Sequence, residues 1–316
     1  HGDYKKIDCM VYGTQASDPY YSALDLYSNY SIDEQINDLK AYWYKVFYSK
    51  KKIKNLYWKK KFKEKKNLNK KHNYDFSFLK KNMSFEDEIS YFSVDERKNV
   101  IKRNFSGFEK IFFVDHHTCH AYYALYGGEL ARTKIKDTLI LTADAYGDKK
   151  NWSVSVANKN GSLKRIASGN NFLVARIYKF CTLILGMKPN EHEYKVMGLA
   201  GYSNAKNYIK KTEKIFYEIL DFKKGLFITK KPLKDSYFDL KDRLEGHRFD
   251  NIAAALQNWT TDIIIKWAEH WLKKTKKKGI AYAGGLSMNI KTNGELFKSP
   301  LVHWLSVPAS GGDESL

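Results

Sequence analysis

Cysteine is scarce in this chain of 316 residues, and its scarcity excludes two classes of protein. The three cysteines, Cys9, Cys119 and Cys181, are too few and too scattered to form the disulfide framework of a small secreted domain. No CxxC pair is present, so the sequence lacks the zinc-binding and thiol redox signatures that such pairs provide. We therefore expect a reducing, cytoplasmic environment.

Long apolar runs are also missing. No stretch approaches the roughly eighteen consecutive apolar residues of a membrane-spanning helix, and the opening residues HGDYKKIDCM lack the apolar core of a secretory signal. We expect no membrane partner. The apolar fraction of 43% is nevertheless well above that of disordered chains, and the length suffices for two domains or for one large bilobal α/β unit.

Acidic residues are outnumbered, with 35 Asp and Glu against 55 Lys and Arg, and the formal net charge is +20. Twelve lysines fall between Lys50 and Lys71, where Glu64 is the one acidic residue. Interleaved aromatic residues such as Tyr57 and Trp58 would let this block follow a phosphate backbone and stack bases. A run of like charge is more often a solvated helical face. The block therefore favours a surface helix and leaves nucleic acid as an alternative partner.

Hydrophobic periodicity and turn residues predict the main elements. Ser31 and Glu34 resemble a capping box at the start of a helix. The Asn160-Gly161 pair between two β-rich runs predicts a hairpin. The expected helices span about 31–66, 116–130, 172–186, 251–278 and 288–298, and the expected strands span about 7–13, 111–114, 138–148, 279–285 and 302–308.

The order of these elements predicts the fold class. From residue 251 onward the chain reads helix, strand, paired glycines, helix, strand, which is the alternation of a parallel or mixed sheet covered by helices. No internal repeat and no linker rich in Pro, Gly or Ser interrupts it. We therefore expect an α/β protein.

Three histidines lie within five residues in VDHHTCHAYYALYGG. His116 and His120 are four apart on the predicted helix, so both rings reach the same point, while His117 lies about a quarter turn away. Such a pair binds an ion firmly only with further ligands, and Asp144 and Asp313 are candidates because each lies in or before a glycine turn at the end of an apolar strand. Iron, manganese and zinc all suit nitrogen and oxygen ligands. Helix packing is the alternative role of the histidines.

Glycine-rich turns form a second group, in the phrases AYGD, MGLAGY, AGGLSMN and SGGD. Each lies where a strand meets a loop or a helix, where bare backbone N–H groups can approach a phosphate or an adenine. None is a Walker A or GxGxxG fingerprint, but four together favour a nucleotide ligand. Lys195, just ahead of MGLAGY, is a candidate phosphate or carbamoyl contact, or else a surface lysine paired with its acidic neighbours.

The phrases DHHTCHAYYAL, LTADAYGD, EYKVMGLAGY, AGGLSMN and VPASGGDES together resemble the O-carbamoyltransferases of nodulation-factor and antibiotic biosynthesis. They cover roughly residues 110–316 in the order of that family, whereas residues 1–109 match loosely. The resemblance implies an actin-like, sugar-kinase-like (ribonuclease H-like) bilobal fold with mixed sheets covered by helices. Such a lobe is shared with the tRNA threonylcarbamoyl-transfer proteins. The expected lobes are residues 1–135, with a lysine-rich helical insertion at about 31–105, and residues 136–316.

The resemblance also implies a two-stage reaction. Carbamoyl phosphate and ATP give carbamoyl-adenylate, and the carbamoyl group then passes to a hydroxyl of a sugar or another small acceptor. A divalent metal, with iron favoured by the resemblance and manganese or zinc as alternatives, is expected to be held by His116, His120, Asp144 and Asp313. The metal would polarise the carbamoyl carbonyl, and His117 is the candidate proton acceptor.

The remaining site residues also follow from the resemblance. Lys195 is expected at the phosphate or carbamoyl end as a catalytic residue. The expected nucleotide-binding residues are Gly198, Gly284, Gly285, Asn289, Gly311 and Gly312.

The chain departs from the family pattern in several places. Ala145 stands where the family has a glycine after the strand aspartate, and the acidic residue later in that turn is Asp148. Opening strands before His1 and a carbamoyl-adenylate-forming C-terminal domain after Leu316 are expected outside this sequence. Two alternative functions remain open: a tRNA threonylcarbamoyl-transfer type of protein, and a basic RNA-binding protein without catalysis.

Overall fold

The computed structural model describes residues 9–15, 31–47, 57, 60–61, 87, 90–105, 110–158 and 160–315. The chain divides into two compact units, residues 1–115 and residues 116–316. The expected division into lobes after residue 135 stays a prediction.

The first unit contains a short parallel strand pair and helical segments. Both strands predicted in this unit form, and β1 (Cys9–Tyr12) pairs with β2 (Lys110–Phe113) in parallel. The guanidinium group of Arg97, at the start of α7 (Arg97–Asn104), lies over the rings of Tyr12 and Phe113 and donates a 2.8 Å hydrogen bond to the carbonyl of Thr14. Arg97 thereby fastens α7 to the strand pair.

The helix predicted from residue 31 begins there. The Ser31 hydroxyl accepts from the backbone N–H of Glu34, and the Glu34 carboxylate accepts from the backbone N–H of Ser31, so the capping box is confirmed. Helix α2 (Ile32–Asp38) continues through a π-helical segment (Leu39–Trp43) into α3 (Tyr44–Phe47).

Most of the lysine block between residues 50 and 71 lies outside the described residues. Two described members of it contact Asp38: the Tyr57 hydroxyl donates a hydrogen bond to its carboxylate, and Lys61 forms an ion pair with it. The Tyr57 ring also stacks on Tyr42 at a centroid distance of 5.3 Å. These two side chains thus contact their own unit, and the role of the rest of the block stays a prediction.

The second unit is built on a mixed five-stranded sheet with the strand order β5-β4-β3-β8-β9. The strands β3, β8 and β9 run parallel to one another, and β4 runs antiparallel to both of its neighbours. A separate antiparallel hairpin, β6-β7, turns between Lys223 and Leu226. The strand bounds are β3 Thr138–Gly147, β4 Lys150–Ala157, β5 Leu163–Gly169, β6 Asp221–Lys223, β7 Leu226–Ile228, β8 Gly279–Ala283 and β9 Trp304–Ser306.

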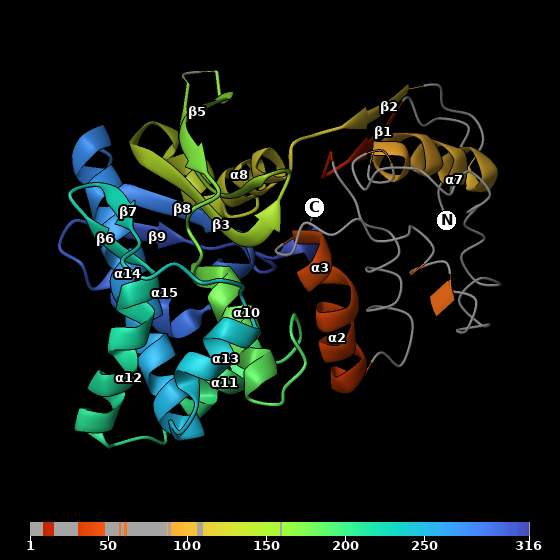
Figure 1. The fold of residues 1–316 in the computed structure, drawn as a ribbon. Helices are drawn as coiled ribbons and strands as arrows, with labels where there is room; N and C mark the ends of the chain where they lie inside the picture. The colour runs from red at the N-terminus through yellow and green to blue at the C-terminus, as the bar shows by residue number, and fades with distance from the viewer. Residues whose placement is uncertain are drawn as a thin grey trace. The chain divides into compact units, whose positions relative to one another are not determined.

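Helices cover both faces of this sheet (Figure 1). Helices α8 and α9 pack on one face, against Ile140 of β3 and Ala281 of β8. Helices α10 and α14 pack on the other, against Leu139 and Leu141, so alternate residues of β3 serve opposite layers. The helix bounds are α8 His116–Tyr126, α9 Glu129–Thr133, α10 Val174–Ile184, α11 Glu193–Leu199, α12 Lys206–Ile219, α13 Phe238–Leu244, α14 Phe249–Thr275 and α15 Ile290–Phe297.

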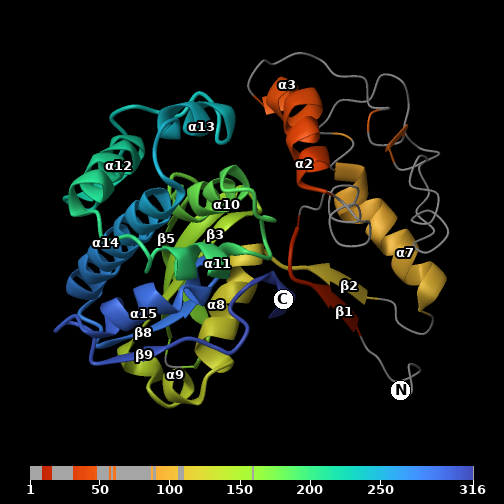
Figure 2. The same ribbon diagram turned by 90° about the horizontal axis from the view of Figure 1, so that it is seen from below.

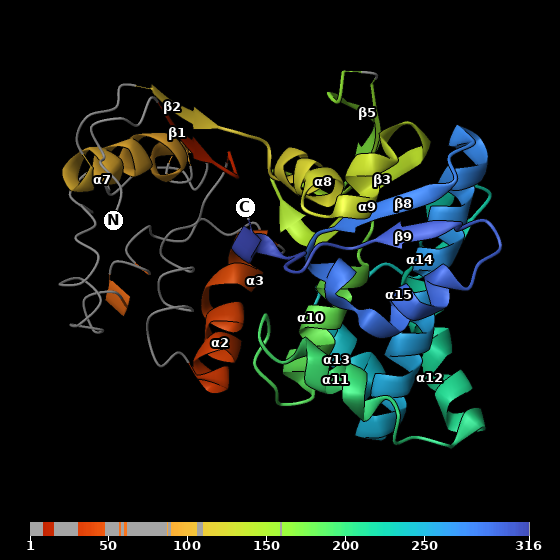
Figure 3. The same ribbon diagram turned by 180° about the vertical axis from the view of Figure 1, so that it is seen from behind.

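The long helix α14 is the centre of the second helical layer. Figure 2 shows α12 and α13 beyond α14, away from the sheet, and Figure 3 shows β8 and β9 between α9 and α15. Trp259 and Trp267 of α14 are fully buried, so the predicted apolar stripe forms the core. Among the described residues, no helix is both long and apolar enough to cross a membrane.

Most predicted elements of this unit are confirmed, with one difference. The hairpin at Asn160-Gly161 forms between β4 and β5, with Gly161 at a φ of +83°. The predicted helix over residues 116–130 instead ends at Tyr126, and α9 starts at Glu129. A Cβ at Gly127 would lie 2.7 Å from the Tyr123 carbonyl oxygen, so this position suits glycine and the chain turns here. The mixed α/β fold class is confirmed.

Candidate metal centre

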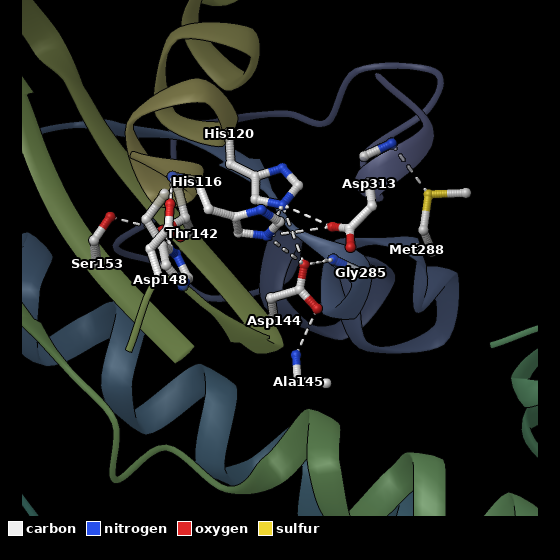
Figure 4. A network of polar contacts seen from close by, with 12 residues as sticks. His116, His120, Thr142, Asp144, Ala145, Asp148, Ser153, Gly285, Met288 and Asp313 are labelled. Carbon is white, nitrogen blue, oxygen red and sulfur yellow. Dashed lines mark hydrogen bonds and ion pairs between the residues drawn. The ribbon is translucent and has the colours of Figure 1, made fainter. Parts of the chain in front are cut away.

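Four side chains of the second unit converge at the carboxyl ends of parallel strands. His116 and His120 lie one turn apart at the start of α8, and Asp144 lies near the end of β3. Asp313 follows β9, beyond the turn of Gly311 and Gly312. Figure 4 shows the four side chains pointing toward one another. The strand ends are where α/β sheets place their ligand sites.

The four ligand atoms are two imidazole nitrogens and two carboxylate oxygens, all within 4.8 Å of one another. The Nε2 atom of His120 lies 3.1 Å from His116 Nε2, 3.1 Å from Asp144 Oδ2 and 3.2 Å from Asp313 Oδ1. The Nε2 atom of His116 lies 3.5 Å and 3.3 Å from the same two oxygens. Tetrahedral ligands at bonds of about 2.0–2.2 Å would be separated by about 3.3–3.6 Å. The side chains therefore have the spacing of a four-ligand metal set.

Hydrogen bonding alone does not account for this convergence. A ring nitrogen has one in-plane hydrogen or lone pair, so His120 Nε2 can form one good hydrogen bond. Three polar atoms nevertheless lie within 3.2 Å of it. A single cation at the centre would satisfy all four atoms together, so the residues present fit a divalent ion with nitrogen and oxygen ligands.

The histidines and the acids of the cluster shift one another's pKa values. Burial lowers the pKa of His116, but hydrogen bonds to Asp144 and Asp313 outweigh burial and raise it to about 10. The pKa of His120 is also raised, because the same two carboxylates outweigh its burial. Burial raises the pKa of Asp144, but the hydrogen bonds from His116 and His120 hold it well below its ordinary value. The cluster thus holds Asp144 as a carboxylate, the form in which it can bind a cation.

Backbone groups orient the buried acid of the cluster. The N–H of Ala145 donates a 2.5 Å hydrogen bond to Asp144 Oδ1, and the N–H of Gly285 donates one of 3.3 Å to Oδ2. Gly285 belongs to one of the glycine turns predicted to bind a nucleotide, and the N–H of its neighbour Gly284 donates to the Gly311 carbonyl at 2.7 Å. Two of the predicted glycine turns therefore meet beside the four-ligand cluster.

The other predicted site residues lie in several places. Lys195 is exposed on α11, with its Nζ 5.8 Å from the centroid of the Tyr194 ring. Gly198 lies on the same helix. Among the described residues, no hydrogen bond or ion pair joins Lys195 to the four-ligand cluster. The structure thus brings together the predicted ligands and two of the glycine turns, whereas Lys195 and Gly198 lie on α11.

Asn289 has a structural role. Its Oδ1 accepts from the backbone N–H of Thr292 at 3.0 Å, which caps α15, and it exchanges two hydrogen bonds with the Gln257 amide of α14. These partners occupy both ends of the Asn289 amide. Its predicted contact with a nucleotide stays a prediction.

His117 faces the sheet. Its Nδ1 lies 2.7 Å from the Thr142 hydroxyl, which lies 2.7 Å from the Ser153 hydroxyl. Burial, followed by the neighbouring charge of His116, lowers the pKa of His117 to about 4, so the ring is neutral at pH 7. Sequence reasoning did not identify Thr142, although its position two residues before Asp144 places both on the same side of β3.

The two acids of the cluster differ in exposure, which gives a first prediction. The Asp144 side chain is 11% exposed and that of Asp313 is 67% exposed. Without metal, Asp144→Ala is expected to lower the free energy of unfolding by roughly 1–3 kcal/mol, because buried donors lose their acceptor. Asp313→Ala should lower it by less than about 1 kcal/mol, as for an exposed ion pair. Urea unfolding in the presence of a chelator measures both, and equal losses would contradict the structure.

Comparison with known proteins gives a consistent family match. The family model described as carbamoyltransferase N-terminus matches residues 4–315. Uncharacterized protein MJ1058 of Methanocaldococcus jannaschii is 29% identical over 238 residues, which are 69% of this chain and 37% of that protein. Nodulation protein NolNO of Sinorhizobium fredii is 27% identical over 209 residues, which are 65% of this chain and 30% of that protein. The chain thus spans less than half the length of these relatives.

Proposed function

We propose that the four-ligand cluster is a metal centre at which a carbamoyl group passes to a hydroxyl acceptor. The chain belongs to the carbamoyltransferase family and matches the N-terminal domain of that family. The match over residues 4–315 confirms the family resemblance seen in the motifs. The observation that carries the proposal is the convergence of His116, His120, Asp144 and Asp313, whose ligand atoms lie within 4.8 Å of one another. Helix packing of the histidines requires no such convergence of acids.

The strand order supports the actin-like fold that the family resemblance implies. Numbered in chain order, the sheet reads 3-2-1-4-5, with the second strand antiparallel to its neighbours. We infer that this sheet is the core of one ribonuclease H-like lobe. Its carboxyl edge carries the two paired glycine turns, which supports a nucleotide beside the metal centre.

The proposed substrate is carbamoyl-adenylate, made from carbamoyl phosphate and ATP, and the acceptor is a hydroxyl of a sugar or another small molecule. The acceptor oxygen forms a bond to the carbamoyl carbon, the bond from that carbon to the phosphate oxygen breaks, and AMP leaves with the electron pair. A bound divalent ion supplies a Lewis acid that polarises the carbamoyl carbonyl and stabilises its developing oxyanion. By family resemblance we propose iron, and the two nitrogens and two oxygens also suit manganese and zinc.

The acceptor proton requires a base. His117 is neutral, as a proton acceptor must be, because its pKa is lowered to about 4. Its ring is fully buried and its Nδ1 contacts Thr142, so His117 also anchors α8 to β3 and would take the acceptor proton through a bridging water. Lys195 stays our proposed contact for the carbamoyl or phosphate end, where its exposed ammonium group would reach a ligand that approaches α11.

A transfer assay tests this function. We expect the metal-loaded chain, given synthetic carbamoyl-adenylate and a panel of sugars, to release AMP and to form a carbamate ester that mass spectrometry detects. The rate should fall to background for His120→Ala and after chelation, because both remove the ion.

The control variant is His303→Ala, which changes an exposed histidine of the same unit and should keep the wild-type rate. Carbamate formation at the wild-type rate in chelated protein would refute a metal-dependent transfer. Carbamoylation of tRNA in place of the sugars would favour the tRNA-modifying alternative.

A further inference from the structure

The turn that follows β3 lies against the first histidine of the cluster. Asp148 accepts a 2.7 Å hydrogen bond from the backbone N–H of His116, the first residue of α8. A Cβ added to Gly147 would lie 2.0 Å from His116 Cδ2 and 2.7 Å from Nε2. Asp148 thus contacts the backbone of His116, a proposed metal ligand, and its neighbour Gly147 lies against the His116 ring.

The Asp148 contact fixes where the ligand helix begins. The Asp148 carboxylate is buried. It accepts a hydrogen bond from the His116 N–H, which is one of the backbone donors that have no partner within the helix at its start. Asp148 has a φ of +48°, a left-handed conformation that aspartate and asparagine adopt more readily than most residues. This conformation is what turns the chain between β3 and β4, whose closing pair is Gly147 and Lys150.

The Gly147 contact fixes where the ligand ring lies. Because glycine has no Cβ, the imidazole of His116 rests directly on the backbone of the strand that carries Asp144. Any side chain at position 147 would displace the ring from the point where the four ligand atoms meet. The hydrogen bond between His117 Nδ1 and the Thr142 hydroxyl fastens the next residue of α8 to the same strand.

We infer that Gly147 and Asp148 are positioning residues that hold His116 in the geometry required for metal binding. This inference rests on the proposed metal centre and adds the part of the chain that orients it. The strand β3 then supplies both a ligand, Asp144, and the turn that places a second ligand, His116. Partners that orient metal ligands in this way typically contribute roughly 10- to 100-fold to metal affinity.

Substitutions at position 148 separate this role from helix stability. Asp148→Gly removes the carboxylate and tolerates the positive φ, whereas Asp148→Asn keeps an acceptor oxygen and also tolerates it. Asp235→Gly is the control, because Asp235 is also a buried aspartate and accepts from the backbone N–H groups of Tyr237, Phe238 and Asp239 at the start of α13, away from the cluster. Titration calorimetry with Mn²⁺ gives the affinity, and thermal unfolding of the metal-free proteins gives the stability.

We expect both Asp148→Gly and Asp235→Gly to lower the melting temperature, and Asp235→Gly to lower it more because Asp235 accepts three backbone hydrogen bonds. Only Asp148→Gly should weaken Mn²⁺ binding, by roughly 10- to 100-fold, and Asp148→Asn should restore the affinity. Gly147→Ala should weaken Mn²⁺ binding as well, because its Cβ displaces the ring. The positioning role would be overturned if Asp148→Gly bound Mn²⁺ as tightly as the wild type does. It would also be overturned if Asp148→Gly and Asp235→Gly lost equal Mn²⁺ affinity. A wild-type chain that binds no Mn²⁺, iron or zinc would overturn the metal centre itself.

Discussion

Replacing His120 by alanine is expected to abolish stoichiometric metal binding. The Nε2 atom of His120 lies within 3.2 Å of all three other ligand atoms, so its loss removes the centre of the ligand set. The His120 side chain is fully buried. Elemental analysis of the purified protein should find about one metal per wild-type chain and almost none in the variant.

The variant His303→Ala serves as the control because His303 is an exposed histidine after α15. It should keep the wild-type metal content. Thermal unfolding should show that His120→Ala remains folded, since the fold has a large core on the other face of the sheet. Full metal content in folded His120→Ala would show that the histidine pair binds no ion.

Replacing Gly284 by alanine is expected to destabilise the second unit strongly. Gly284 has a φ of +96°, and a Cβ there would lie 2.2 Å from the Ala143 carbonyl oxygen. With a ψ of 157°, Gly284 occupies a backbone region that essentially only glycine adopts. A residue with a Cβ in that region costs about 1–3 kcal/mol, and the clash with the backbone adds to this cost. We expect a total loss of more than about 3 kcal/mol, which for a unit of this size lowers the melting temperature by roughly 6–12 °C.

Gly294→Ala is the matched control, because a Cβ at Gly294 in α15 meets no atom within 4 Å. It should be neutral or slightly stabilising, since alanine favours the helix. Differential scanning calorimetry measures both variants. If Gly284→Ala proved as stable as the control, Gly284, which follows β8, would not lie against the Ala143 carbonyl of β3. That result would contradict the structure.

The helices and strands of the second unit were largely predictable because their periodicity is strong. The stripe from Ile252 to Trp271 predicted a helix over residues 251–278, and α14 spans Phe249–Thr275. The break between α8 and α9 was missed although Gly127 and Gly128 mark it, because both flanking segments carry helical residues. The π-helical segments of the first unit, Leu39–Trp43 and Phe92–Glu96, have no known sequence signal of comparable strength.

The ligand set was predictable in part. Helical spacing alone placed His116 and His120 on one face, but their distance to Asp144 and Asp313 depends on which strands lie side by side in the sheet. The positions of the two acids beside glycine at the ends of apolar strands made them candidates, and the family resemblance implied the same two residues. The structure brings them together, and the pairing of β3 with β8 and of β8 with β9 is the reason.

The residues that orient the ligands were not predictable. The contact of Asp148 with the His116 backbone depends on a left-handed turn whose direction the sequence does not specify. The close approach of the His116 ring to Gly147 is likewise a tertiary contact between residues 31 positions apart. Such contacts follow from packing, which a one-dimensional pattern does not contain.

An anomalous difference map from crystals of the metal-loaded chain tests the central claim most directly. We predict one peak within about 2.0–2.2 Å of two imidazole nitrogens and two carboxylate oxygens, those of His116, His120, Asp144 and Asp313. A map without a peak at that point, or with Asp313 turned away from both histidines, would contradict it.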